Sequence, residues 1–497
     1  MPSLIRLVVP VCITLMIGTT SRAQNLETYI ANAPFKMPVV TVPQFPDRTF
    51  TITDFGAIGN GKTLNTAAFA SAIDACAKAG GGRVIVPAGT WLTGPIQFQS
   101  NIDLHVEKGA IVQFTSDRTQ FPLIKPSPTS KNNYMVMPPV YGYGLENVAI
   151  TGEGIFDGAG EAWRPLKKSK ADNGLWSKFL SSGGVLSKDG KIWWPSREAL
   201  EGEDYIKTLK KKGGELTEKD FLPARDFLRP KMIVFDNCKN VLYDGVTFRN
   251  SPMFVVNPQH CINLTIRNVH VFNEWWAQNG DGMDISACNG VVIYNTSVSA
   301  GDDGICMKSS GKSEDAALQN MIIANCTVYR AHGGFVIGSN TDGGMQNIYV
   351  THCNFIGTDI GIRVKSNAGR GGLVKNIYID NIEMNNIVNE AILFDTYYED
   401  VTAGKEKGDV KTTVQDKVPE FTNFYIKNVN CQGAGAAIKI TGLPQMPVHD
   451  IYFQDMRIVA NTGFTSVDAR DIYLKNVNII APKPIYNTGN CKNIKIE

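Results

Sequence analysis

The side chains best suited to acid–base chemistry gather in four short motifs near the middle of the chain. These motifs are Asn279-Gly280-Asp281, Asp302-Asp303, His332-Gly333 and Arg363-Val364-Lys365. Cleavage of a glycosidic bond needs one carboxylic acid to protonate the leaving oxygen and one carboxylate to activate water or attack carbon. The three aspartates supply these groups, and crowding favours a state in which one of them keeps its proton near neutral pH. The arginine can bind a planar carboxylate through two parallel hydrogen bonds, and the lysine adds a point charge beside it.

The spacing of these motifs matches a repeat that runs through most of the chain. Asp281 and Asp302 are 21 residues apart, Asp303 and His332 are 29 apart, and His332 and Arg363 are 31 apart. Ten apolar segments recur at similar intervals, each opened by Asn, Asp or Gly: Asn240, Asn263, Gly290, Asn320, Asn347, Asn376, Asn423, Asp450, Asp471 and Asn493. A parallel coil of about 20 to 30 residues per turn stacks equivalent strand positions about 4.8 Å apart. The motifs would then line one groove.

We therefore predict an all-β fold, a single-stranded parallel β-helix, over residues 49–497. Residues 24–48 are rich in proline and are expected to be extended. Two charged excursions, at about 157–229 and 397–420, interrupt the repeat and are expected to border the groove.

A helix is expected before the first coil. Four apolar side chains fall on one helical face: Phe69, Ala72, Ile73 and Cys76. Asn65 can cap the start of this helix, and the glycines at 80–82 end it. Such a helix would cover the open apolar end of the coil.

The first 23 residues have the features of a secretory signal peptide. Arg6 precedes the apolar run from Leu7 to Ile17, and Ser21-Arg22-Ala23 is a small-x-small cleavage pattern. The run is about half the ~20 residues that a membrane span needs, so we expect export to the periplasm or the medium, and no membrane span. Loss of Arg6 and Arg22 leaves 47 basic against 47 acidic residues. An anionic substrate must then be held by a local cluster of cations, and nucleic-acid binding is disfavoured.

Nine cysteines remain after the signal peptide, and several occupy equivalent positions of the repeat. Stacked buried thiols behave as small hydrophobes, so we expect free thiols rather than a disulfide framework despite export. No Cys-x-x-Cys or mixed Cys/His spacing suggests zinc. We predict neither a metal nor a cofactor.

Taken in order, the four motifs resemble those of the polygalacturonase family of pectin-degrading glycoside hydrolases, glycoside hydrolase family 28, and the resemblance extends from about Phe50 to the C-terminus. It implies a right-handed, pectin lyase-like β-helix and hydrolysis of α-1,4-linked galacturonic acid with inversion. Asp302 would be the general acid, and Asp281 and Asp303 would hold and deprotonate the attacking water. Inverting enzymes separate the two carboxyl groups by roughly 6.5 to 9.5 Å.

The resemblance also assigns roles to the other polar residues of the motifs. His332 would adjust the hydrogen bonding around the acid, and Arg363 with Lys365 would bind the galacturonate carboxylate beside the cleaved bond. Asn279 and Tyr397 are further candidates for substrate binding. Three departures from the family's usual motifs remove none of these polar groups: Gly280, Ala331 and Val364.

Three features resemble the exo-acting bacterial members of that family, whose grooves are closed into pockets. They are Lys308, the excursion at 157–229 and the run from Arg363 to Gly372. Lys308 shares strand parity with Asp302 and could contact a second substrate carboxylate. We therefore expect an exo-acting hydrolase that binds a pectic polymer or oligogalacturonide as a monomer.

Other functions fit parts of the pattern. A calcium-dependent pectate or polysaccharide lyase would use aspartates to bind calcium and an Arg or Lys to abstract a proton. A hydrolase of a branched or rhamnogalacturonan-type pectin would keep the carboxylates. A carbohydrate-binding solenoid would keep the groove without needing three crowded carboxylates.

Overall fold

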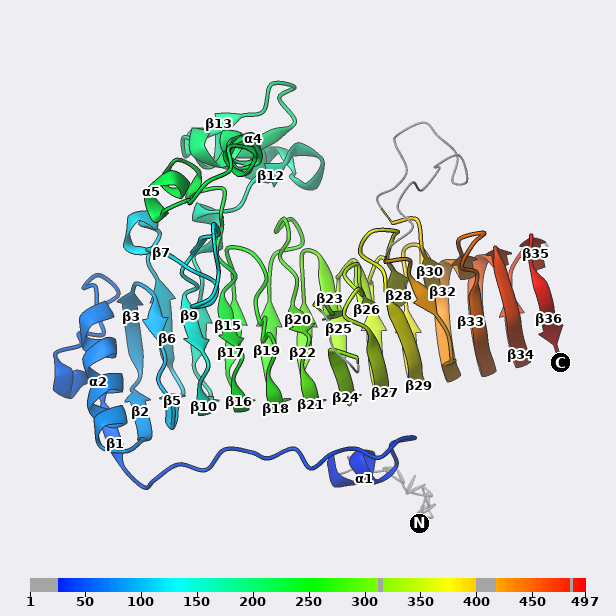
Figure 1. The fold of residues 1–497 in the computed structure, drawn as a ribbon, viewed down its shortest axis with the longest axis horizontal. Helices are drawn as coiled ribbons and strands as arrows, with labels where there is room; N and C mark the ends of the chain where they lie inside the picture. The colour runs from blue at the N-terminus through cyan, green and yellow to red at the C-terminus, as the bar shows by residue number, and fades with distance from the viewer. Residues whose placement is uncertain (1–25, 312–315, 399–416, 483–485) are drawn as a thin grey trace, which may run out of the picture.

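The chain winds into an elongated coil of parallel strands (Figure 1). A computed structural model describes residues 26–311, 316–398, 417–482 and 486–497. Successive strands along the chain do not pair with one another but with the strand one coil further on, as in β20–β23, β21–β24 and β22–β25. The predicted right-handed parallel β-helix is confirmed, with the right-handed crossover that parallel strands favour. The signal peptide proposed for residues 1–23 lies outside the described residues.

Three parallel ladders run along the coil. The first carries the site motifs and contains β4 (Ile96–Gln97), β9 (Val140–Tyr143), β15 (Ile233–Asp236), β20 (Met283–Ser286), β23 (Asp303–Lys308), β26 (Gly333–Ile337), β28 (Ile362–Lys365) and β30 (Glu390–Asp395). The second contains β1 (Thr49–Thr51), β2 (Gly82–Val86), β5 (Ile102–Val106), β10 (Glu146–Gly152), β16 (Lys239–Asp244), β18 (Ile262–Arg267), β21 (Asn289–Tyr294) and β24 (Leu318–Ala324).

The third ladder contains β3 (Gly89–Thr93), β6 (Ala110–Phe114), β11 (Ile155–Asp157), β17 (Thr247–Arg249), β19 (His270–Phe272), β22 (Ser297–Ser299) and β25 (Thr327–Tyr329). Toward the C-terminus single long strands take part in more than one ladder. They are β27 (Met345–Ile356), β29 (Leu373–Asn385), β32 (Phe424–Thr441) and β33 (Val448–Val467). The coil ends with β34 (Ala469–Ile480), β35 (Tyr486–Gly489) and β36 (Lys492–Ile496), while β31 (Glu420–Phe421) pairs with β29.

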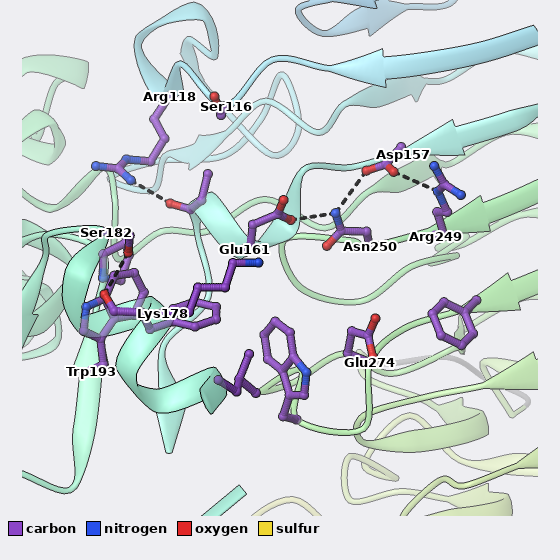
Figure 2. A pocket seen from close by; sticks show the side chains of 16 residues that line it. Ser116, Arg118, Asp157, Glu161, Lys178, Ser182, Trp193, Arg249, Asn250 and Glu274 are labelled. Carbon is purple, nitrogen blue, oxygen red and sulfur yellow. Dashed lines mark hydrogen bonds and ion pairs between the residues drawn. The ribbon is translucent and has the colours of Figure 1, made fainter. Parts of the chain in front are cut away.

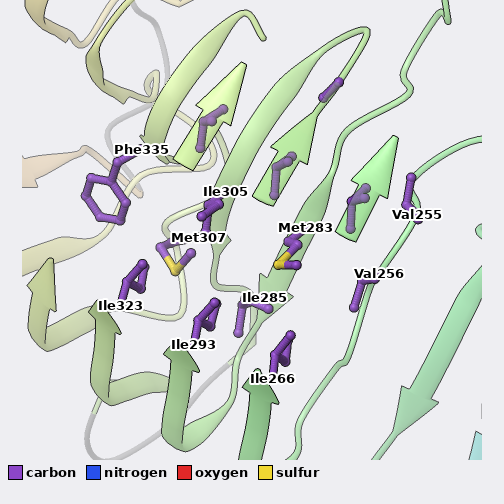
Figure 3. Close-up of a cluster of buried hydrophobic side chains, with 14 of the residues drawn as sticks. Val255, Val256, Ile266, Met283, Ile285, Ile293, Ile305, Met307, Ile323 and Phe335 are labelled. Atoms are coloured by element: carbon purple, nitrogen blue, oxygen red, sulfur yellow. The ribbon is translucent and has the colours of Figure 1, made fainter. Parts of the chain in front are cut away.

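The interior of the coil is a column of stacked apolar side chains (Figure 3). Met283 lies beside Ile305, which in turn lies beside Phe335 on the next strand. All three side chains are buried. Each coil therefore buries its own apolar residues against the coils before and after it, which is why one core can extend over so many residues.

The repeated asparagines that mark the coils have a structural cause. Asn147, Asn240 and Asn263 have left-handed φ angles of 52°, 55° and 58°, a conformation that asparagine tolerates better than most residues. Their amides form a ladder along the coil: Asn240 Nδ2 donates to Asn147 Oδ1 at 2.8 Å, and Asn263 Nδ2 donates to Asn240 Oδ1 at 2.9 Å. The same ladder continues in the bonds Asn347 to Asn320 and Asn376 to Asn347.

The predicted cap is helix α2 (Thr66–Lys78), which packs on the first coil through the expected buried residues Phe69, Ala72, Ile73 and Cys76. Asn65 is the N-cap residue of this helix, as predicted, but its side chain makes no capping bond. Asn65 Oδ1 instead accepts from the Ile58 N–H at 2.7 Å, and its Nδ2 donates to the Leu92 carbonyl at 3.1 Å. The side chain thus connects the loop at Ile58 with strand β3 (Gly89–Thr93) and leaves the helix end uncapped by a side chain. A short helix η1 (Ile52–Phe55) precedes α2.

The segment before residue 49 is not extended throughout. It begins with helix α1 (Leu26–Ala31), and Tyr29 on this helix packs against Ile322 and Tyr349 on the outside of the coil. From α1 the chain runs along the outside of the second ladder back to β1 (Figure 1). The correction follows from burial, since a short apolar helical turn covers exposed side chains of β24 and β27.

The excursion at 157–229 forms a mixed lobe above the coil (Figure 1). Its helices are η3 (Gly160–Ala162), η4 (Lys168–Lys170), α3 (Asn173–Ser181), α4 (Arg197–Lys211), α5 (Glu218–Phe221) and η5 (Leu222–Ala224). Its strands β12 (Leu166–Lys167), β13 (Val185–Leu186) and β14 (Ile192–Trp194) form a small antiparallel sheet. An earlier loop adds η2 (Arg118–Gln120) and the hairpin of β7 (Leu123–Ile124) with β8 (Met135–Val136). Most of the second excursion, from residue 399 to 416, lies outside the described residues.

The nine cysteines behave as the repeat predicts. All are free thiols, and eight of them are buried. Cys238, Cys261 and Cys288 stack in successive coils, and burial raises the pKa of the Cys261 thiol well above its ordinary value. No helix of the described residues is long and apolar enough to cross a membrane.

Candidate active site

The four motifs meet on the first ladder, as predicted. Asp281 lies two residues before β20, Asp302 directly precedes β23, and His332 directly precedes β26. Arg363 and Lys365 lie within β28. The strands β20, β23, β26 and β28 are neighbours in this order. Residues up to 84 positions apart in sequence, from Asp281 to Lys365, therefore share one surface.

Glycines beside the aspartates allow the chain to turn tightly between the third ladder and the first. A Cβ on Gly304 would lie 2.5 Å from Val328 Cγ1 and 2.8 Å from the Gly333 carbonyl oxygen. A Cβ on Gly282 would likewise lie 2.7 Å from the Gly304 carbonyl oxygen. Real Cβ atoms do not approach backbone so closely, and only glycine fits at such contacts. The Asp-Gly pairs of the motifs are thus explained by the close stacking of successive corners.

Asp303 is held by both cations of the last motif. Arg363 Nη1 donates to Asp303 Oδ1 at 3.1 Å, and Lys365 Nζ donates to Asp303 Oδ2 at 2.7 Å. Burial opposes the charge of Asp303, but Lys365 and Arg363 outweigh it and hold the pKa of this carboxyl below its ordinary value. Both cations also lie over the ring of Tyr398, with Lys365 Nζ 4.7 Å from the ring centroid.

Asp302 is paired with the imidazole of the third motif. His332 Nδ1 lies 3.1 Å from Asp302 Oδ1, while the other ring nitrogen, Nε2, lies 3.7 Å from Asp359 Oδ2. Burial opposes the charge of Asp302, but the hydrogen bond from His332 outweighs it and lowers the pKa of the carboxyl. The unliganded protein therefore favours an ionised Asp302.

Asp281 shares one lysine with a second carboxylate that the sequence did not single out. Lys308 Nζ lies 3.4 Å from Asp281 Oδ2 and also contacts Asp284 Oδ1. Asp281 and Asp284 are both buried. Burial and mutual repulsion raise the pKa of Asp281 well above its ordinary value, and burial raises the pKa of Asp284. Asp281 Oδ1 is buried and accepts no hydrogen bond from any described residue, so it can accept one from a bound water.

One oxygen each of Asp281, Asp302 and Asp303 lies within 4.8 Å of the others. This is the closest approach of oxygen atoms, a shorter measure than the spacing of whole carboxyl groups, so the wider separation of inverting enzymes stays a prediction. The pKa is raised for Asp281 and lowered for Asp302 and Asp303, which favours a proton on Asp281 over one on the other two. For Asp302 to act as an acid, it must gain a proton when substrate binds.

The same three oxygens have a spacing that could hold a metal ion, but the neighbouring charges do not fit one. Each carboxylate already has a basic partner: Lys308 for Asp281, His332 for Asp302, and Arg363 with Lys365 for Asp303. Calcium prefers six to eight oxygen ligands. A divalent cation at this place would lie among three fixed cations, Lys308, Arg363 and Lys365. The negative charge of the carboxylates is therefore balanced by side chains of the protein.

The sequence did not reveal every contact of the site. Asn279, a predicted substrate ligand, is half-buried, and its Oδ1 accepts from Arg229 Nη2 at 3.0 Å. Tyr397 is buried, and its N–H donates to Asp395 Oδ1 at 3.0 Å. The ring against the cations belongs to the next residue, Tyr398. The predicted clamp residues Arg363 and Lys365 and the predicted ligand Lys308 are all paired with carboxylates of the protein itself.

Lys170, contributed by the lobe, reaches the catalytic motifs. Its Nζ donates to the Gly301 carbonyl at 3.1 Å and lies 3.3 Å from His332 Nε2. A cavity of about 410 Å³ is lined by Lys170, Arg330, His332, Asp359 and Trp275. No repeat or motif in the sequence connects residue 170 with this place, because the lobe lies outside the coil.

Comparison with known proteins identifies similar chains over most of this length. The model of the family described as glycosyl hydrolases family 28 matches residues 223–495. An exo-poly-alpha-D-galacturonosidase of Dickeya chrysanthemi is 26% identical over 500 residues, covering 97% of this chain and 77% of the relative. The crystal structure of a hyperthermoactive exopolygalacturonase of Thermotoga maritima superposes with a TM-score of 0.68 at 28% identity, covering 94% of this chain and 95% of the other. A family 28 exopolygalacturonase of Yersinia enterocolitica supports the fold alone, with a TM-score of 0.66 at 21% identity over 90% of this chain and 78% of the other.

Proposed function

Because this chain belongs to family 28 of the glycosyl hydrolases, we propose that it hydrolyses α-1,4-linked galacturonan and releases its products from a chain end. One observation carries the proposal: three carboxylates, each with one oxygen within 4.8 Å of an oxygen of the others, are surrounded by Lys308, Arg363 and Lys365 on one ladder. Carboxylates supply the acid and base that glycoside hydrolysis requires, and the cations suit a substrate that brings carboxylates of its own.

In the proposed reaction, Asp302 gives its proton to the leaving glycosidic oxygen. Water held by Asp281 and Asp303 attacks the anomeric carbon from the opposite face and loses a proton to this carboxylate pair. Arg363 and Lys365 bind the carboxylate of the sugar beside the cleaved bond, which competes with Asp303 for these two cations. The added negative charge raises the pKa values of nearby carboxyls. Substrate binding thereby favours the proton on Asp302 that the acid step needs.

The exo-acting part of the proposal rests on the lobe at 157–229. Lys170 of this lobe reaches the Gly301 carbonyl and His332, so the lobe bounds the site on the side of the earlier coils (Figure 1). Such a wall hinders a long polymer from lying through the groove. The similar proteins of Dickeya chrysanthemi and Thermotoga maritima are named as an exo-poly-alpha-D-galacturonosidase and an exopolygalacturonase, which supports exo action here.

The test is to incubate the purified protein with de-esterified polygalacturonate in EDTA and to identify the earliest products. We expect saturated mono- or digalacturonate from the outset and no loss of rate on removal of divalent cations, because side-chain cations already compensate the carboxylates. A ladder of intermediate oligomers early in digestion would contradict exo action. Unsaturated products that require calcium would replace the proposal with a lyase.

Lys170 gives a sharper test of the lobe. We expect Lys170→Met to raise KM for oligogalacturonate about tenfold, since a hydrogen bond to a charged group contributes roughly 1.5–3 kcal/mol, and to change kcat only a few-fold. The matched control is Lys168→Met, a lysine of the same short helix η4 that lies over the Trp176 ring instead. Equal KM values for the two variants would show that Lys170 does not bind substrate, and would contradict a role of the lobe in substrate binding.

His332 should control the pH dependence of the reaction. Asp302 acts in its protonated form, so kcat/KM falls as pH rises through the pKa of Asp302, which His332 lowers. We expect His332→Gln to reduce kcat and to move the alkaline limb of the kcat/KM profile to higher pH, because burial then dominates the pKa of Asp302. A limb that stays in place, or moves to lower pH, would contradict this role.

We also propose that the protein is exported and acts as a monomer in the periplasm or the medium. The features of residues 1–23 support export. Fractionation of cells followed by sequencing of the mature N-terminus would test it, with Gln24 expected as the first residue.

A further inference from the structure

A second and larger cavity lies between the lobe and the ends of the third ladder, apart from the carboxylate cluster (Figure 2). It has a volume of about 740 Å³ and is lined by none of the four catalytic motifs. The lobe contributes Lys178 and Trp193, and strand β17 contributes Arg249. The turn after β19 contributes Glu274 and Trp276. A pocket of this size with aromatic walls and a few polar groups is the usual form of a small-molecule site.

This cavity is adjacent to the catalytic site through a shared turn. Trp275 lines the smaller cavity beside His332, and Trp276, its neighbour in the chain, lines the larger one. The same turn continues to Asp281 within five residues of Trp276. The two cavities therefore share the turn that carries Trp275 and Trp276.

One wall of the cavity is a fixed group of aromatic rings. The ring centroids of Phe179 and Trp193 are 4.8 Å apart, and those of Phe179 and Trp276 are 5.4 Å apart. The buried guanidinium of Arg164 lies 5.1 Å from the centroid of the Trp276 ring. Aromatic walls suit the C–H face of a sugar ring, which is apolar although its rim carries hydroxyls.

The charges of this cavity differ from those of the catalytic site. Two of the three lining cations are paired, Arg249 with Asp157 at 2.8 Å and Arg118 with Asp226 at 3.0 Å, while the third, Lys178, is exposed. Glu161 accepts from Asn250 Nδ2 at 2.6 Å, and both Glu161 and Glu274 are exposed at the cavity. Free carboxylate oxygens accept hydrogen bonds from sugar hydroxyls and repel a uronate.

We propose that this cavity binds an uncharged sugar that the galacturonan carries as a branch. The inference rests on the proposed function, because the branch is held by the polymer that the catalytic site cleaves. It adds a second saccharide site, with hydroxyls on Glu161, Glu274 and Asn250 and a ring face on the aromatic wall.

Direct binding is tested by saturation-transfer NMR of the whole protein with methyl β-D-xylopyranoside, and with methyl α-D-galactopyranosiduronate as the charged probe. We expect the neutral glycoside to bind and Glu161→Ala/Glu274→Ala to weaken it at least tenfold. Glu161→Gln/Glu274→Gln, which keeps acceptor oxygens but removes both charges, should retain the neutral sugar and admit the uronate. The uronate probe also binds at the catalytic cations, so its binding to the cavity is read only as the difference between the unchanged protein and the glutamine variant. No gain of uronate binding in the glutamine variant, or equal binding of the neutral glycoside to the unchanged protein and the alanine variant, would overturn the proposal.

Kinetics then separates a branch from a free sugar. The measured quantity is the ratio of kcat/KM on galacturonan with single xylose branches to kcat/KM on unbranched polygalacturonate, with the latter as internal reference. We expect the ratio to fall at least fivefold in the alanine variant. Binding of the free glycoside with an unchanged ratio would overturn the branch assignment. Absence of any galacturonan hydrolysis would refute the proposed function, whereas the NMR result would still decide whether the cavity takes a neutral sugar.

Discussion

Asp302→Asn is expected to lower kcat on oligogalacturonate by about 10²–10⁴-fold, the usual contribution of a positioned general acid. KM should change little, because the amide has nearly the same shape and the substrate cations Arg363 and Lys365 bond to Asp303 instead. The amide can still accept the hydrogen bond from His332 Nδ1, which is 3.1 Å from the carboxylate oxygen. The loss is therefore one of proton donation rather than of structure.

The leaving group distinguishes this role from the role of the base. An aryl galacturonide with an acidic phenol as leaving group needs little protonation, so Asp302→Asn should lose far less activity on it than on the natural linkage. Asp281→Asn and Asp303→Asn should lose equally on both substrates, since water must be activated in either case. Asp359→Asn is the matched control, because this exposed carboxylate lies 3.7 Å from the same imidazole. If Asp302→Asn kept more than a tenth of kcat, the general acid would have to be a residue other than Asp302.

The repeat made the coil predictable because its signal has a local cause. Asn240 and Asn263 adopt the left-handed conformation near the start of β16 and β18, and each bonds to its equivalent one coil away. Position in the sequence therefore translates directly into position along the coil. The motifs are placed correctly for the same reason. Asp281, Asp303 and Lys365 come from coils that pair in register.

The contacts that the sequence missed depend on geometry across coils or outside them. Strand parity puts Lys308 on the outer face, but only the register of β20 with β23 shows that Asp284 is its partner. Asp284 had one weak signal, a charged residue alternating with apolar ones in β20. Lys170 had no comparable signal, because the lobe follows no repeat. Tyr397 and Tyr398 are neighbours in the chain, but the ring of Tyr397 is buried whereas the ring of Tyr398 lies against the cations. The sequence alone did not distinguish the two.

Lys308→Met is expected to destabilise the protein by about 3–5 kcal/mol near neutral pH, the usual result of removing one partner from a buried ion pair. Lys308 is the cation between Asp281 and Asp284, and both carboxylates are buried. Without it, the buried Asp284 carboxylate loses the cation that is paired with it, and its negative charge remains in the interior. The matched control is Lys439→Met on the same ladder. Lys439 Nζ lies 3.6 Å from Glu390 Oε1, and the lysine side chain is 40% exposed. This ion pair should contribute about 0–1 kcal/mol to the free energy of unfolding.

The pH dependence of this deficit tests its cause. Burial already raises the pKa of Asp284 above its ordinary value, and loss of Lys308 raises it further. The folded variant therefore binds more protons than the unfolded chain, so its free energy of unfolding falls as pH rises from about 4 through the folded-state pKa. Urea midpoints should show a deficit relative to the unchanged protein that is large at pH 8 and small at pH 4.5.

The double variant Lys308→Met/Asp284→Asn should recover much of the lost stability, because it removes a buried charge together with its partner. A deficit that is independent of pH would mean that the lysine stabilises the coil through packing on Phe254, which its Nζ approaches to 4.7 Å from the ring centroid, rather than through the carboxylates.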